Sequence, residues 1–82
     1  MMQDQADFDR QVVSLITENA HTMRKLLAIQ AISKSTGSLL VQNEKTENDY
    51  KYMLQLSNLK YQCRMKPHLK FDRTIVDLHD NP

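Results

Sequence analysis

The sequence contains very little glycine, proline and cysteine, and it has no tryptophan. The single glycine, Gly37, argues against a hairpin-rich β fold and against a glycine-rich phosphate loop, because both depend on residues with positive φ. The single cysteine, Cys63, provides no disulfide framework, which is typical of an intracellular protein of the cytoplasm or nucleus. Long segments with few breaks therefore predict an all-α chain.

Long apolar runs are also missing, since no stretch of about 18 apolar residues is present to span a bilayer. The first ten residues are polar and acidic, unlike the basic and then apolar start of a signal peptide. We therefore expect no membrane partner. The 82 residues make one domain at most, and a chain of this size buries only about 60% of its unfolded surface.

The net charge of +1 is unevenly distributed along the chain. Residues 1–49 carry seven acids and five bases, residues 50–71 carry five bases and no acid, and residues 72–82 carry three acids and one base. Such asymmetry indicates a nucleic acid, an acidic partner, or neutralisation between elements of the same fold.

Two long helices are predicted, over about residues 7–36 and 45–66. Gly37 suits the end of the first helix, and Pro67 disfavours the α conformation at the residue before it, which ends the second. The two helices are expected to form an antiparallel helical hairpin, followed by a short extended C-terminal tail.

This pattern divides the chain into a helical hairpin interaction domain, residues 1–66, and a C-terminal tail segment, residues 67–82. Both predicted helices have more apolar surface than a two-helix hairpin covers. In the first, the apolar arc spans roughly 200°, whereas a helix with one neighbour needs little more than about 100°.

In the second predicted helix, the apolar residues form two stripes on nearly opposite sides. One stripe comprises Tyr52, Leu56, Leu59 and Cys63, and the other comprises Tyr50, Leu54, Tyr61 and Met65. A bare stripe would expose on the order of several hundred Å², the size of patch that marks an interface. The hairpin is therefore expected to be completed as a bundle or coiled coil with a second chain.

We accordingly predict a non-enzymatic protein–protein interaction subunit, a small adaptor or scaffold component that acts by helix packing. The partner is either a copy of this chain or a different subunit. The expected partner-binding residues of the helical faces are Ile16, Met23, Leu27, Leu54, Leu56, Leu59 and Tyr61. No small-molecule substrate is expected, because a hairpin offers no scaffold to enclose a pocket.

No catalytic residue, metal site or cofactor is predicted. Cys63 and His68 form a single loose pair, whereas structural zinc needs four ligands, commonly in closely spaced pairs. One thiol and three scattered histidines form no signature of a nucleophile.

Nucleic-acid binding is an alternative function, carried by the basic segment of residues 60–70. The possible contacts are Lys60, Arg64, Lys66 and Lys70. Basic side chains interleaved with tyrosines suit contacts with phosphates and with nucleobases. However, Lys51 and Lys60 lie on opposite sides of the predicted helix, and bases near its C-terminus also stabilise the helix dipole.

The C-terminal tail has enough apolar side chains to bind a protein surface. Its expected docking residues are Phe71, Ile75, Val76 and Leu78. The stretch IVDLHD, residues 75–80, resembles a SUMO-interacting motif, which has two β-branched residues, Asp, Leu and further acids. The resemblance implies an extended peptide that adds a strand to the modifier's sheet, although His79 departs from the acidic flank. Alternatively, the same side chains fold back onto the hairpin or dock on a partner subunit.

Overall fold

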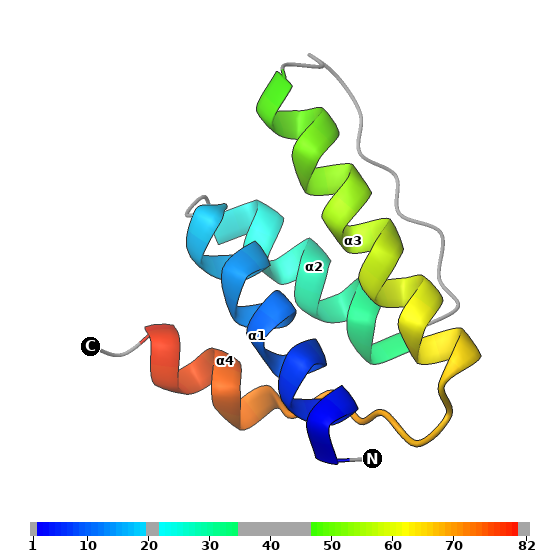
Figure 1. Ribbon diagram of the computed structural model, residues 1–82. Helices are drawn as coiled ribbons and strands as arrows, with labels where there is room; N and C mark the ends of the chain where they lie inside the picture. Colours follow the sequence, from blue (N-terminus) through cyan, green and yellow to red (C-terminus); the bar gives the residue numbers. More distant parts are fainter. Residues whose placement is uncertain (1, 20–21, 35–46, 81–82) are drawn as a thin grey trace.

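The computed structural model describes residues 2–19, 22–34 and 47–80, and these ranges contain four helices and no strand (Figure 1). The helices are α1 (Met2–Glu18), α2 (Thr22–Lys34), α3 (Glu47–Met65) and α4 (Arg73–Asp80). The all-α class predicted from the sequence is therefore confirmed.

The predicted single helix over residues 7–36 is wrong, because it is divided into α1 and α2. Asn19 ends α1: its backbone N–H and its side-chain Nδ2 both donate to the carbonyl oxygen of Leu15, over 3.1 and 2.7 Å. Asparagine side chains that bond to nearby backbone groups in this way are less favourable inside a helix than at its ends. The break thus needs neither glycine nor proline.

Helix α3 agrees with the prediction for residues 45–66. It carries Glu47 and Asp49 in its first turn and Arg64 in its last, so these charges complement the helix dipole. The N–H of Lys66 still donates to the carbonyl of Gln62 over 2.8 Å, and Pro67 follows directly. The predicted stop before the proline is confirmed.

The predicted extended tail is wrong for residues 73–80, which form α4. Asp72 is the N-cap: its Oδ1 accepts from the N–H of Thr74 over 2.9 Å, and its carbonyl accepts from Ile75 over 3.2 Å. Phe71 and Val76 flank this cap at the two positions of a hydrophobic staple, and both pack into the core.

The core is formed within one chain, and every helix contributes to it. Its buried apolar residues are Phe8, Val12, Leu15, Ile16, Ala28, Ala31, Ile32, Tyr52, Leu56, Leu59, Leu69 and Val76. Helix α1 packs against the other three helices, and α2 also packs against α3 (Figure 1). Two of these core residues, Leu69 and Val76, follow the predicted domain boundary at residue 66.

Polar contacts with α1 hold the segment that leads to α4. The side chain of Gln5 accepts from the backbone N–H of Lys70 over 2.9 Å and donates to its carbonyl over 2.7 Å. Asp4 lies beside Lys66 and His68, at 3.8 Å from Nζ and 3.3 Å from Nε2. Helix α1 therefore fixes the path of the chain after Pro67.

Candidate protein-docking site

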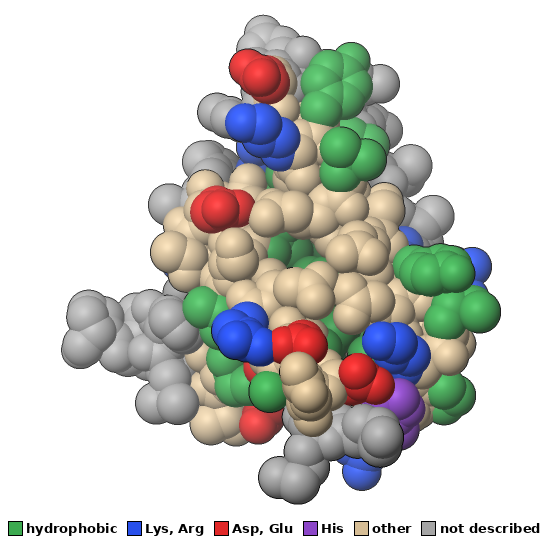
Figure 2. All heavy atoms as spheres, in the orientation of Figure 1, with side chains coloured by type: hydrophobic (Ala, Val, Ile, Leu, Met, Phe, Trp, Pro, Cys, Tyr) green, Lys and Arg blue, Asp and Glu red, His purple; other side chains and the backbone are tan. Residues whose placement is uncertain are grey.

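One apolar face of α3 is exposed and is not covered by any other described part of the chain. Its side chains, with their exposed fractions, are Tyr50 (53%), Leu54 (71%), Tyr61 (59%) and Met65 (59%). We call these four residues the exposed stripe. Figure 2 shows hydrophobic side chains in two groups along the edge of the molecule formed by α3. Leu26, which is also exposed, belongs to α2.

The opposite face of α3 is buried in the core. Tyr52, Leu56 and Leu59 are each 1% exposed, and Cys63 is half-buried against the same cluster. The two stripes expected from the sequence thus differ in environment: one forms the core and the other faces outward. Since the core is already packed within the chain, the exposed stripe is not needed to close it.

Amide side chains along one edge of α3 join it to α1. Gln11 of α1 accepts hydrogen bonds from Asn58 and Gln62 over 3.2 and 2.8 Å, and Gln55 donates to Glu18 over 2.9 Å. The pairing of early α1 residues with late α3 residues makes the two helices antiparallel. This polar seam fixes the rotation of α3, and therefore the direction in which the exposed stripe points.

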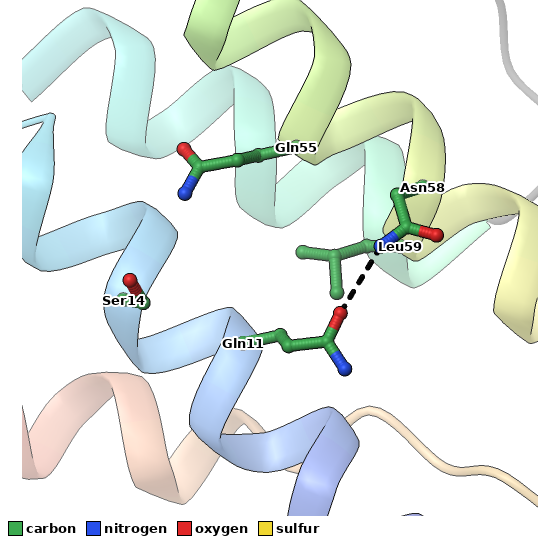
Figure 3. A pocket seen from close by; sticks show the side chains of 5 residues that line it. All are labelled: Gln11, Ser14, Gln55, Asn58 and Leu59. Atoms are coloured by element: carbon green, nitrogen blue, oxygen red, sulfur yellow. Dashed lines mark hydrogen bonds between the residues drawn. The ribbon is translucent and has the colours of Figure 1, made fainter.

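A small cavity of about 100 Å³ opens at this seam (Figure 3). Its lining residues are Gln11, Ser14, Gln55, Asn58 and Leu59. Pockets for small molecules typically have about 300–1,000 Å³, so this cavity has room only for water.

The first turns of α3 are fixed by an ion pair between Arg24 of α2 and the buried Asp49. The guanidinium also lies over the ring of Tyr52, 5.7 Å from its centroid, and the Tyr52 hydroxyl donates to the Arg24 carbonyl over 2.9 Å. These contacts hold the N-terminal half of α3, which carries Tyr50 and Leu54, on the rest of the fold.

Burial raises the pKa of Tyr52, an effect larger than the opposing one of the nearby Arg24 charge. Because the unfolded chain then loses this proton first, the stability due to Tyr52 is fully present below about pH 10 and is lost as the pH rises through the folded pKa. Urea unfolding above pH 10 should show this loss. Tyr52→Phe should reduce the fall in the free energy of unfolding with rising pH, whereas the control Tyr61→Phe, which changes an exposed ring, should show the same fall as the wild type. The same dependence of unfolding free energy on pH in both variants would contradict the attribution of this loss to Tyr52.

The other predicted helical contact residues have different environments. Ile16, Leu56 and Leu59 lie in the chain's own core, because α1 and α3 pack on each other there. Leu27 is half-buried on α2, and the side chain of Met23 lies outside the described residues. Of the predicted set, Leu54 and Tyr61 are the described side chains that remain exposed.

The described side chains of the predicted tail residues are partly or fully covered by the rest of the chain. Val76 is buried, and Phe71 and Ile75 are half-buried. The side chains of Leu78 and His79 lie outside the described residues. Of the interpretations left open for the tail, folding back onto the chain agrees with this geometry, although the surface it covers is α1 rather than the exposed stripe.

The predicted nucleic-acid contacts do not form one uniform patch. Lys66 is paired with Asp4, and Lys60 is half-buried and has an interaction of its own. Arg64 and Lys70 are exposed. Part of the positive charge of residues 50–71 is thus neutralised by α1.

Within the described residues there is no group of three or more His, Cys, Asp or Glu side chains that could hold a metal ion. The half-buried Cys63 thiol has a pKa raised by burial, which disfavours the thiolate needed for metal binding. None of the described helices combines the length and the hydropathy needed to cross a membrane.

Sequence reasoning missed three groups that position the site: Asn19, the Arg24–Asp49 pair and Gln5. Only the Asn19 break has a local signal, an asparagine within the predicted apolar arc. The other contacts join residues 25 or more positions apart, so they cannot be predicted from helical periodicity.

Comparison with known proteins found no matching family model, and no similar curated protein or solved structure.

Proposed function

We propose that this chain is a non-enzymatic protein–protein interaction module, a small adaptor or scaffold subunit that docks a helix of another chain along the exposed stripe. One observation carries the proposal: four large apolar side chains remain exposed on a helix whose opposite face lies in the core. Apolar stripes of this kind on a monomer mark interaction surfaces.

The geometry of the exposed stripe suits a helix. From Tyr50 to Met65 it extends over about 22 Å, at 1.5 Å per residue. Its spacing of four, seven and four residues follows one side of a helix, as in helix-in-groove and coiled-coil contacts.

The composition of the exposed stripe is also that of an interface. Tyrosine and methionine are enriched in interface cores, and polar residues form the rim. Here the exposed side chains of Lys51 and Arg64 flank the apolar residues on either side. Because Leu54 is exposed, it contributes little to the stability of the isolated chain and is available for binding.

The test is affinity purification from cells that make this protein, with the wild type and Leu54→Glu as baits. A buried carboxylate in an apolar interface is costly, so Leu54→Glu should reduce recovery of the bound protein by about tenfold or more. Circular dichroism should show unchanged helicity.

The matched control is Gln30→Glu, which adds the same charge at an exposed position of α2. It should leave recovery unchanged. Equal recovery with Leu54→Glu and with the wild type would contradict docking along the exposed stripe.

A further inference from the structure

The exposed stripe has a symmetric spacing. Tyr50 and Met65 lie equally far from a point midway between Ser57 and Asn58, and so do Leu54 and Tyr61. We propose that a second copy of this chain covers the exposed stripe, in an antiparallel pair of α3 helices related by a two-fold axis at this point. The inference rests on the proposed function and names the chain that docks.

A two-fold axis at this point pairs unlike residues of the two copies. Tyr50 meets Met65 of the second copy, and Leu54 meets its Tyr61, so each of the four exposed side chains has an apolar partner. Thioether sulfur and aromatic rings attract each other, which favours the first pair. At the axis, the small exposed Ser57 allows the two helices to approach closely. Such self-complementarity is what an isologous dimer requires.

The two ends of α3 carry opposite charges. The first turn of α3 is acidic through the exposed Glu47, and its last turn is basic through the exposed Arg64. About the proposed axis, the acidic first turn of each copy lies near the basic last turn of the other, whereas Arg64 comes level with Lys51 of the second copy. The axis lies close to the middle of α3, so the helices overlap along nearly their whole length.

The available area sets the strength of the pair. The four side chains are 53–71% exposed, which is on the order of 100 Å² each, so two copies bury on the order of 800 Å². This area is below the range of stable interfaces, about 1,200–2,000 Å², and is typical of weak and reversible complexes. We therefore infer a concentration-dependent dimer.

Disulfide trapping of single-cysteine variants tests the orientation, in a Cys63→Ala background checked by circular dichroism. Under mild oxidation Ser57→Cys, next to the axis, should form linked dimers several-fold more efficiently than Tyr50→Cys. Two copies of residue 50 lie about 22 Å apart along an antiparallel pair. A mixture of Tyr50→Cys with Met65→Cys should yield the mixed dimer.

Efficient self-linking of Tyr50→Cys together with absence of the mixed dimer would overturn the antiparallel pair. Sedimentation equilibrium of the unchanged chain gives a second measurement that does not depend on cysteine variants. The mass should rise towards twice the monomer with concentration, and Leu54→Glu should abolish the rise. A constant monomer mass overturns the self-pairing, while the proposed function still stands if Leu54→Glu loses a different protein in the affinity purification.

Discussion

Leu56→Ala should lower the free energy of unfolding by about 2–4 kcal/mol, because Leu56 is fully buried between α3 and the rest of the core. Removing its methyl groups loses their burial and leaves a cavity that surrounding helices fill only in part. In a domain of this size the loss corresponds to a fall in melting temperature of about 10 °C or more. Urea unfolding followed by circular dichroism measures it.

Leu54→Ala is the matched control, because it makes the same chemical change on the same helix two residues away. Leu54 is 71% exposed, so its replacement should change the free energy of unfolding by less than about 0.5 kcal/mol. Equal effects of the two substitutions would mean that α3 is rotated differently about its axis, and the assignment of the exposed stripe would fail.

Val76→Asp should destabilise the protein by about 3 kcal/mol or more, because it places a carboxylate in the core where α4 packs on α1. Such a loss is a large share of the stability of an 82-residue domain. We expect both a lower melting temperature and a loss of helical signal, since α4 would no longer be held against α1.

Thr74→Asp serves as the control for this substitution. It introduces the same side chain into the same helix, at an exposed position in the first turn, where an acid interacts favourably with the helix dipole. The melting temperature should stay unchanged or rise slightly. If Val76→Asp were equally harmless, α4 would not be part of the core.

Val76→Asp and Thr74→Asp also bear on whether residues 75–80 bind a modifier as an extended strand or pack in the core as part of α4. Strand addition to a modifier such as SUMO requires residues 75–80 to be extended and free. In the structure they belong to α4, and Val76 is buried. A chain that used these residues for strand addition would first have to detach and unfold α4.

The sequence predicted α3 and its two stripes well, because a period of 3.6 residues over 19 positions leaves little ambiguity. Pro67 set the end of this helix for a local steric reason. Which stripe would be buried could not be predicted, since that depends on α1 and α2 packing against Tyr52, Leu56 and Leu59.

The two errors in the fold have different origins. Helix α4 had a local signature, with Asp72 as N-cap and Phe71 and Val76 in staple positions, but its β-branched residues favoured an extended interpretation. At the break, the side chain of Asn19 bonds back to the carbonyl of Leu15, and the period of the apolar residues does not predict this bond.

Hydroxyl-radical footprinting provides the most direct test that the exposed stripe is a docking surface. Oxidation of Tyr50, Leu54, Tyr61 and Met65 is measured in the dilute purified chain and again inside the cells that make it, with the exposed Leu26 of α2 as internal reference. We predict that oxidation of the exposed stripe, relative to Leu26, falls several-fold in cells. An unchanged ratio would contradict docking along α3.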